Sequence, residues 1–330
     1  MNTDQTLLVT GGAGFIGSHF VWRRRVHRPE QRIVVLDALT YAGDPHASAG
    51  IEGVTFIQGN VCDGVLVRRI LADHAVGGIV HLAAETHVDR SLADAEVFVR
   101  TNVLGTATLL AAARDHGQIE AMVHVSTDEV YGELADGAPP WTPNQPLAPR
   151  SPYAASKASA DHLAQAWFDT FGLPVCITRC TNNYGPRQTP EKLVPVIITR
   201  ALAGAPIPIY GDGLQRRSWI HVEDHCDGLE AALDRGEPGQ IYHLASDEEH
   251  DNLTIVRRIL QTLDLPETRI SHVRDRQGHD RRYALNTAET KKALAFAPKR
   301  SLEMGISETV AWYVDNPAWV AAALTRMRAS

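Results

Sequence analysis

Residues 10–17 of the chain are TGGAGFIG, and they directly follow Leu7–Thr10, a short apolar segment typical of a buried strand. Glycines at positions 11, 14 and 17 allow a tight turn, close approach of the backbone to a pyrophosphate, and close packing of the following helix. The three glycines alone could equally form a tight turn that binds no ligand. Asp37, however, ends the next apolar segment 20 residues after Gly17, where a carboxylate binds ribose hydroxyls and repels a 2′-phosphate. We therefore predict that the chain binds NAD rather than NADP.

Short apolar segments alternate with helix-length segments through the first half of the chain. The expected strands are Leu7–Thr10, Ile33–Asp37, Val54–Gln58, Gly78–Leu82, Met122–Ser126 and Pro174–Arg179. The expected helices between them include Phe15–Val26, Ala93–Ala113 and Tyr153–Phe171. This alternation predicts an α/β fold, in which right-handed crossovers produce a doubly wound parallel sheet of the Rossmann type, covered by helices on both faces.

The pattern changes after about residue 180, where loops rich in proline, glycine and arginine alternate with short helices. We expect residues 1–180 to form the NAD-binding Rossmann domain and residues 181–330 to form a smaller substrate-binding domain. Residues 220–245 again resemble part of a sheet. We expect them to return to the first domain, so that the two domains are interleaved.

Composition narrows the possible partners and compartments. The 330 residues carry a formal net charge of −7, which disfavours a nucleic-acid partner. We find no stretch of about 18 apolar residues that could span a membrane and no signal peptide, so we expect a cytoplasmic protein. His221 and His225 are four residues apart, but no third ligand is evident nearby, and we expect no metal site.

Two further motifs contain groups suited to acid–base chemistry. Tyr153 and Lys157 share one face of a helix. The neighbouring lysine ammonium and an oxidised nicotinamide would both favour the tyrosine phenolate. Such a pair also occurs by chance on helix surfaces, but a nearby hydroxyl usually completes a site of this kind, and Thr127 supplies one. Asp128 and Glu129 follow the fifth expected strand, where open α/β sheets bind ligands. They could form a solvated turn, but beside a hydride-transfer triad we interpret them as a general acid and a general base.

These motifs together resemble the extended short-chain dehydrogenases/reductases, and among them the nucleotide-sugar 4,6-dehydratases of the dTDP-glucose type. The matching segments run almost from end to end: TGGAGFIGSHF, LDALTYAGD, HLAAETHVDRS, TNVLGT, STDEVYG, SPYAASKASADHL, RCTNNYGP, PEKLVP, YGDG, WIHVEDH and GHDRRYA. DEVYG combined with PEKL and GHDRRY is highly specific.

The resemblance implies a reaction sequence. Tyr153, aided by Lys157 and Thr127, removes the proton of the sugar 4-hydroxyl while hydride passes from C4 to NAD. Glu129 then removes the acidified C5 proton, Asp128 protonates the departing 6-hydroxyl, and hydride returns to C6. The product is a 4-keto-6-deoxy sugar.

The resemblance also implies which residues contact each ligand. Those expected to bind NAD are Gly11, Gly14, Phe15, Ile16, Gly17, Asp37, Thr40, Asn60, Val61, Leu82, Ala83, Ala84, Thr101, Tyr153 and Lys157. Those expected to bind the substrate are Thr86, Thr127, Asn182, Glu191, Lys192, Tyr210, Arg217, Asn252, His279 and Tyr283. Family members are commonly homodimers through two helices per subunit, and Ala93–Ala113 and Tyr153–Phe171 are the candidates.

The chain departs from the family pattern at Arg187-Gln188-Thr189, in Gln215-Arg216-Arg217-Ser218-Trp219, and at Asn60, where aspartate is usual. The first two departures lie in the expected nucleotide-binding region, which leaves UDP-glucose or a related nucleotide sugar open as the substrate. A nucleotide-sugar epimerase or decarboxylase is the alternative enzyme, but such relatives lack the Asp-Glu pair. A non-catalytic NAD-sensing protein is the alternative of another class, and such proteins usually lose the Tyr/Lys pair.

Overall fold

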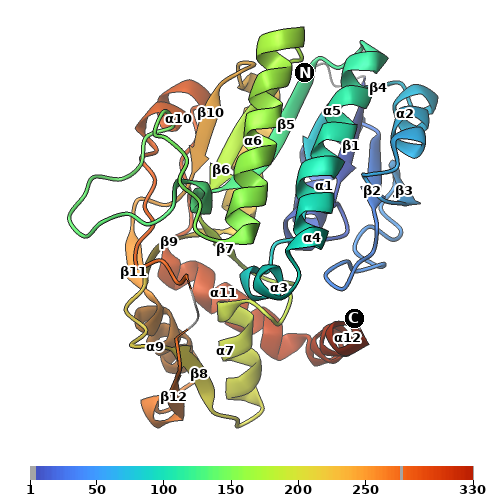
Figure 1. The fold of residues 1–330 in the computed structure, drawn as a ribbon. Helices are drawn as coiled ribbons and strands as arrows, with labels where there is room; N and C mark the ends of the chain where they lie inside the picture. The colour runs from blue at the N-terminus through green and yellow to red at the C-terminus, as the bar shows by residue number, and fades with distance from the viewer. Residues whose placement is uncertain (1–4, 276–277, 330) are drawn as a thin grey trace.

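The structure, a computed structural model, describes residues 5–275 and 278–329 and is dominated by one parallel sheet (Figure 1). The first four residues, on which the expectation about a signal peptide partly rests, lie outside the described residues. The strands are β1 (Thr6–Thr10), β2 (Ile33–Asp37), β3 (Val54–Gln58), β4 (Val76–His81), β5 (Ala121–Thr127), β6 (Val175–Cys180) and β10 (Ile241–Leu244). Their order is β10-β6-β5-β4-β1-β2-β3, and all neighbours are parallel. The predicted doubly wound sheet is therefore confirmed, with the strand order reversing between β1 and β4.

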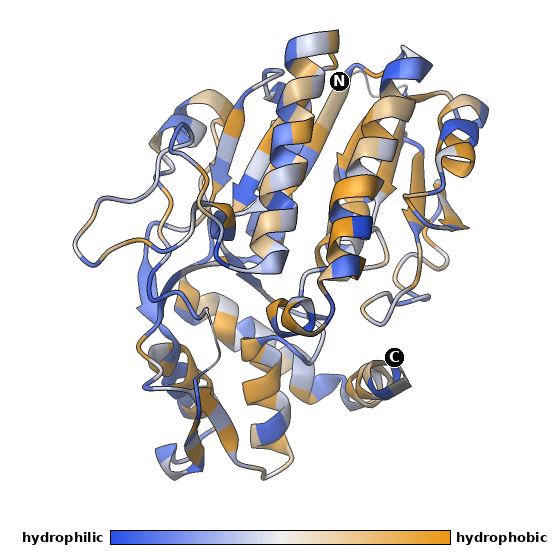
Figure 2. Ribbon diagram, viewed as in Figure 1, coloured by the Kyte–Doolittle hydropathy of each residue, from blue (hydrophilic) through white to orange (hydrophobic). Residues whose placement is uncertain are grey.

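Helices cover both faces of this sheet because alternate strand residues point to opposite sides. Leu7 and Val9 of β1 pack in a core with α1 (Phe15–His27) and α8 (Val222–Arg235). Leu8 packs on the other face with α2 (Gly64–Asp73) and α5 (Gly105–His116). Figure 2 shows hydrophobic residues along the strands and along α5.

The helix α6 (Pro152–Phe171) has well-defined ends in the sequence. The side chain of Ser151 accepts a hydrogen bond from the Ala154 N–H, and Pro152 occupies the first turn, where its missing N–H costs no hydrogen bond. Gly172 ends the helix in the left-handed conformation (φ 67°). These signals fix the register of the helix that carries Tyr153 and Lys157.

The single helix expected over Ala93–Ala113 is wrong in detail. The chain forms α3 (Val88–Ala93), α4 (Ala95–Phe98), a π-helix η1 (Val99–Leu104) and α5. Asp94 interrupts the first two because it has non-helical dihedral angles and caps α4 through Glu96 N. The π-helix places Asn102 so that its side chain bonds the backbone of Glu85 and the Ser156 hydroxyl.

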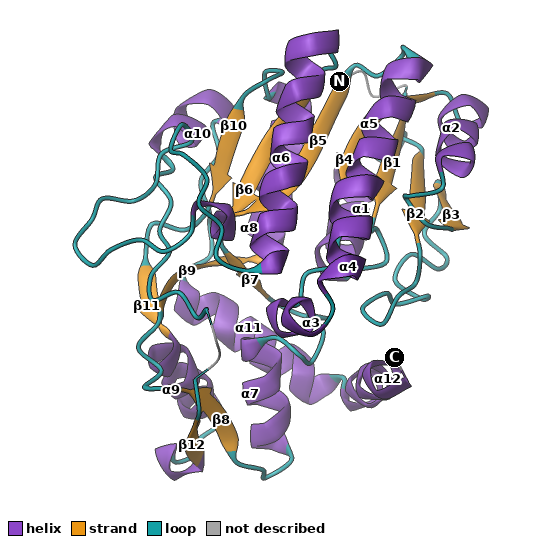
Figure 3. Cartoon of the chain, viewed as in Figure 1, coloured by secondary structure: helices purple, strands orange, loops and turns teal. Residues whose placement is uncertain are grey.

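A smaller region lies beside the carboxyl ends of the large sheet, and loops connect the two (Figure 3). It contains a three-stranded sheet, β11 (Glu249–Asp251), β9 (Arg216–His221) and β7 (Asn182–Tyr184), and a two-stranded sheet, β12 (Ile270–Val273) and β8 (Ile207–Tyr210). Its core joins α7 (Leu193–Leu202), α9 (Asn252–Thr262) and α11 (Leu302–Asp315).

The remaining helical segments are η2 (Asp128–Tyr131), η3 (Glu267–Arg269), α10 (Ala288–Leu294) and α12 (Pro317–Ala329). Trp319 of α12 donates from Nε1 to Asp44 Oδ2 over 2.9 Å, so the last helix contacts the loop that follows β2. No helix within the described ranges is long and apolar enough to cross a membrane.

Candidate functional site

A cavity of about 340 Å³ opens where the strands of the large sheet end. Every residue that the sequence predicts to contact NAD lines it: Gly11, Gly14, Phe15, Ile16, Gly17, Asp37, Thr40, Asn60, Val61, Leu82, Ala83, Ala84, Thr101, Tyr153 and Lys157. The same cavity is lined by Thr127, Asp128 and Glu129, and by Thr86, Asn182, Glu191 and Lys192. The structure thus brings together the glycine turn, the segments at the carboxyl ends of β2, β3, β4 and β5, and residues of α6.

The glycine turn leaves a backbone surface that side chains would fill. Gly11 has φ 71°, and a Cβ there would lie 2.6 Å from the Ala83 nitrogen. A Cβ on Gly17 would lie 2.2 Å from the Gly11 oxygen. Gly14 begins α1 without a side-chain cap, so the N–H groups of its first turn can receive an anion. This cradle fits a dinucleotide pyrophosphate.

Asp37 lies at the carboxyl end of β2. Its Oδ2 accepts a hydrogen bond of 2.9 Å from the Ala13 N–H, and its Oδ1 accepts one of 2.8 Å from the Leu39 N–H. Burial raises the pKa of Asp37, and these two bonds oppose the rise. The bonds anchor the carboxylate between the glycine turn and the following loop, which is the position expected of a ribose ligand.

The groups suited to acid–base chemistry come from two elements. Thr127 ends β5, donates to Asp128 Oδ1 over 3.2 Å, and accepts from the Glu129 N–H over 3.3 Å as the N-cap of η2. Tyr153 and Lys157 lie on α6, and the Lys157 ammonium donates to the Val125 carbonyl over 2.7 Å.

Burial changes the acidity of these groups. The pKa of Asp128 is raised to about 7, first by burial and then by the charge of Glu129. The pKa of Tyr153 is raised well above its ordinary value by burial and by Glu129, while a hydrogen bond with Thr127 opposes the rise. Burial lowers the pKa of Lys157, and the charge of Asp161 opposes that change. Burial and Glu129 therefore favour the protonated form of Asp128, as a general acid requires.

Three segments meet beside the cavity, and two of the side chains that join them, Tyr41 and Arg90, were not singled out from the sequence. Tyr41, in the loop after β2, donates to Glu191 Oε1 over 3.1 Å. The Arg90 guanidinium lies 3.7 Å from the centre of the Tyr41 ring and 3.8 Å from Glu191 Oε2. Lys192 donates to the Thr86 carbonyl over 2.9 Å. Tyr41 and Arg90 do lie in LDALTYAGD and HLAAETHVDRS, which is the signal that could have found them.

The other residues predicted to bind substrate do not line this cavity: Tyr210, Arg217, Asn252, His279 and Tyr283. Arg217 is buried, donates to the backbone carbonyls of Arg281 and Asp280, and lies 4.1 Å over the Tyr283 ring. Its charge nevertheless lowers the pKa of Asp128. Arg217 and Tyr283 therefore adjoin the acid–base groups without facing the open space.

The three residues at 187–189, where the chain departs from the family pattern, line two different cavities. Gln188 and Thr189 line the large one. Arg187, which has a left-handed backbone (φ 62°), instead lines a small cavity with Gly14, Tyr41 and Trp319. Arg187 thus lies beside the glycine turn, and Thr189 lines both cavities.

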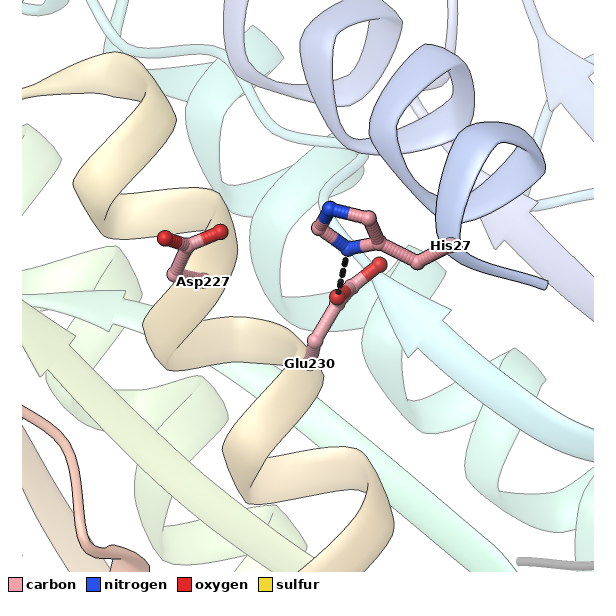
Figure 4. A group of neighbouring side chains, drawn as sticks. All are labelled: His27, Asp227 and Glu230. Atoms are coloured by element: carbon pink, nitrogen blue, oxygen red, sulfur yellow. Dashed lines mark hydrogen bonds and ion pairs between the residues drawn. The ribbon is translucent and has the colours of Figure 1, made fainter.

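One group of side chains of the metal-ligating types stands apart from the cavity, on α1 and α8 (Figure 4). In it His27 and Glu230 point toward one another, with Nδ1 and Oε2 2.8 Å apart, and Asp227 lies one turn away. Asp227 is already paired with Arg23 and Lys299. These two cations offset the negative charge that would attract a metal ion.

Comparison with known proteins gives consistent matches over almost the whole chain. Residues 8–309 match the family model described as GDP-mannose 4,6 dehydratase. A dTDP-glucose 4,6-dehydratase from Streptomyces antibioticus is 48% identical over 95% of this chain and 93% of its own length. The dTDP-glucose 4,6-dehydratase DesIV from Streptomyces venezuelae, solved with NAD and TYD bound, superposes with a TM-score of 0.92 at 45% identity, over 97% of this chain and 100% of that one. A UDP-glucose 4-epimerase from Thermotoga maritima, solved with UDP-glucose, has a TM-score of 0.89 at 26% identity, over 95% of this chain and 100% of that one.

Proposed function

Because the chain belongs to the nucleotide-sugar 4,6-dehydratases of the extended short-chain dehydrogenase/reductase family, we propose that it binds NAD and removes water from dTDP-glucose. The product is the corresponding 4-keto-6-deoxy sugar, so the enzyme is a hydro-lyase. The observation that carries the proposal is the pair Asp128 and Glu129, which lines the same cavity as Tyr153, Lys157 and Thr127.

The first step is oxidation at C4. The glycine turn and Asp37 would hold NAD, which when bound would supply a hydride acceptor for C4 of the glucose and a hydride donor for C6. Tyr153 removes the proton of the 4-hydroxyl. Burial disfavours the phenolate of Tyr153. The hydrogen bond with Thr127 and the positive charge of Lys157 are therefore needed to favour it.

The second step is elimination of water across C5 and C6. The ketone at C4 acidifies the C5 proton, which the Glu129 carboxylate removes. The 6-hydroxyl leaves as water after it takes the proton of Asp128, whose pKa of about 7 suits a general acid. When C6 is reduced, Glu129 returns its proton to C5, so that Asp128 has lost one proton and Tyr153 holds the proton of the 4-hydroxyl. Transfer of that proton from Tyr153 to Asp128, directly or through solvent, resets the site.

The alternatives account for fewer of these residues. The epimerase from Thermotoga maritima shows that this fold also supports another reaction, so the fold alone does not decide the activity. An epimerase needs only oxidation and reduction at C4, which leaves Asp128 and Glu129 without a task. A non-catalytic NAD-sensing protein would have no use for Tyr153, Lys157 and Thr127.

A panel of nucleotide sugars tests the activity and the base together. Purified protein is incubated with dTDP-glucose, UDP-glucose and GDP-mannose, and products are followed by mass spectrometry for loss of one water. We expect turnover of dTDP-glucose above the others, as the names of the relatives suggest. A preference for UDP-glucose would correct the base but keep the reaction, whereas no loss of water from any sugar would refute the dehydratase assignment.

We further propose that the enzyme is a homodimer, built on α4, η1 and α5 together with α6. Five of the exposed large apolar side chains lie on α3, α4, η1 and α6: Leu92, Val97, Val99, Leu104 and Phe171. Exposed apolar surface of this kind is typical of a protein interface. Light scattering should give twice the chain mass, and Leu104→Asp should shift the protein toward the monomer.

We also propose a cytoplasmic location, and a division into an NAD-binding domain at residues 1–180 and a nucleotide-sugar-binding domain at 181–330. The joining of β10 to the edge of the large sheet supports the return of residues 220–245 to the first domain.

A further inference from the structure

A chain of buried polar contacts links the two elements that carry the acid–base groups. Asp161 lies on α6 one turn after Lys157, and its Oδ2 accepts a hydrogen bond of 2.9 Å from Arg179 Nε. Arg179, on β6, donates from Nη1 to the hydroxyl of Tyr131, the last residue of η2. The same hydroxyl lies 2.7 Å from His243 Nε2, on β10.

All of these side chains are inaccessible to solvent. Asp161, Arg179, Tyr131 and His243 are at most 3% exposed. Removing two charges from water is costly, and replacing a buried ion pair by apolar side chains often leaves stability unchanged or improved. The chain of contacts is therefore poorly explained as a device for stability alone.

The arginine fork suits a different task. Its planar guanidinium holds donors at fixed angles, so a single Arg179 side chain sets the position of Asp161 relative to Tyr131. The guanidinium also lies 4.7 Å over the Tyr131 ring, which restrains the ring as well as its hydroxyl. His243 is held in turn, because its Nδ1 lies 2.9 Å from the Asn286 carbonyl oxygen.

The two ends of this chain of contacts bear on different chemical steps. Asp161 is on the helix that carries Tyr153 and Lys157, the oxidation pair. Tyr131 ends η2, the single turn that carries Asp128 and Glu129, the elimination pair. Besides the direct contacts of Thr127, the Asp161–Arg179–Tyr131 chain is a further connection between the two pairs.

We propose that Arg179 is a positioning residue that, through Asp161 and Tyr131, fixes the elimination pair relative to the oxidation pair. It thereby sets how often a sugar oxidised at C4 goes on to lose water rather than reverting to the alcohol. This inference rests on the proposed dehydratase function.

The variant Tyr131→Phe tests it, because it keeps the ring and removes the hydroxyl that joins Arg179 to η2, together with that hydroxyl's bonds to His243 and to the Pro143 carbonyl. We expect C4 oxidation, measured as the burst of reduced-nicotinamide absorbance after mixing with dTDP-glucose, to change little. Formation of the 4-keto-6-deoxy product, and exchange of the C5 proton with deuterated water, should fall about 10- to 100-fold, since misplacement by about 1 Å costs up to that much.

Tyr242→Phe is a matched control. Tyr242 is buried on β10, and its hydroxyl accepts a hydrogen bond from the Glu237 N–H, away from both pairs. This variant loses a buried tyrosine hydroxyl bond like Tyr131→Phe, yet the ratio of elimination to oxidation should stay that of the wild type.

Arg179→Lys keeps the positive charge beside Asp161 but cannot bridge to Tyr131 in the same geometry. It should reproduce the shifted ratio, so the test stands even if Tyr131→Phe folds poorly. The inference is overturned if the folded variants slow oxidation and elimination in equal proportion, or slow neither. A wild-type protein that neither oxidises nor dehydrates any nucleotide sugar would instead refute the proposed function.

Discussion

Among single residues, Asp128 gives the clearest prediction for how the dehydration rate depends on pH. Its pKa is raised to about 7 because it is buried and faces the charge of Glu129. A general acid works only while protonated, and the protonated fraction falls as the pH rises through the pKa. We expect the dehydration rate at saturating substrate to fall above about pH 7 in a pH–rate profile.

Asp128→Asn should abolish this alkaline limb and lower the rate by about 10²–10⁴-fold, the usual contribution of a positioned acid. An alkaline limb that persists unchanged in Asp128→Asn would assign the ionisation to another group.

Glu129 and Tyr153 should fail at different steps. Glu129→Gln keeps the shape of the side chain but cannot accept the C5 proton, so we expect reduced-nicotinamide absorbance with little 4-keto-6-deoxy product. Its exchange of the C5 proton with deuterated water should be slower by about 10²-fold or more. Tyr153→Phe should block the first step and show almost no absorbance change.

Near-normal dehydration and C5 exchange by Glu129→Gln would contradict this division of labour. Glu191, which lines the same cavity, would then be the base to test next.

Asp37 should decide between the two nicotinamide cofactors. Its carboxylate is anchored by the N–H groups of Ala13 and Leu39 and lines the cavity. Asp37→Ala removes a ribose acceptor and the charge that repels a 2′-phosphate, so NAD should bind more weakly and NADP more tightly, as measured by calorimetry on cofactor-free protein. An unchanged NAD affinity would show that Asp37 is not the ribose ligand.

At the level of elements, the loop after β2 is tied to the segment before α7 by Tyr41 and Glu191. Such a link across the cavity should slow the escape of a bound cofactor. We expect Tyr41→Phe, which keeps the ring under Arg90 but loses the hydrogen bond, to retain less NAD after gel filtration than the wild type. Thr199→Val, at a residue of α7 that does not line the cavity, is the control; equal retention in both variants would show that the link does not affect cofactor binding.

Six of the seven strands of the large sheet could be placed from the sequence to within two residues, since runs of Val and Ile between polar ends have few other uses in a globular protein. The seventh, β10, could be placed only within residues 220–245. The π-helix η1 could not. It depends on Asn102 reaching Glu85 and Ser156, which are distant in the sequence and adjacent only in the fold.

At the level of the whole molecule, the predicted site residues divide by their origin. Those next to strand ends line one cavity, because parallel strands bring their carboxyl ends to one edge. The positions of Arg217 and Tyr283 depend on how distant loops pack, and the sequence carries no local signal for that packing. For the same reason the contact between Tyr41 and Glu191, 150 residues apart, escaped prediction.

The position of β10 has a consequence for how the protein is made. During synthesis β6 emerges from the ribosome before residues 241–244, which form its partner strand β10. Until then Ile177 and its neighbours form an unpaired edge of the sheet. Unpaired apolar edges recruit other chains, and this interval is when the nascent protein is most exposed to aggregation. A fragment ending at residue 180 should therefore accumulate in the insoluble fraction when expressed alone, while the full chain stays in solution. A soluble, monomeric fragment that retains NAD would show instead that residues 1–180 fold without aggregating through the unpaired edge of β6.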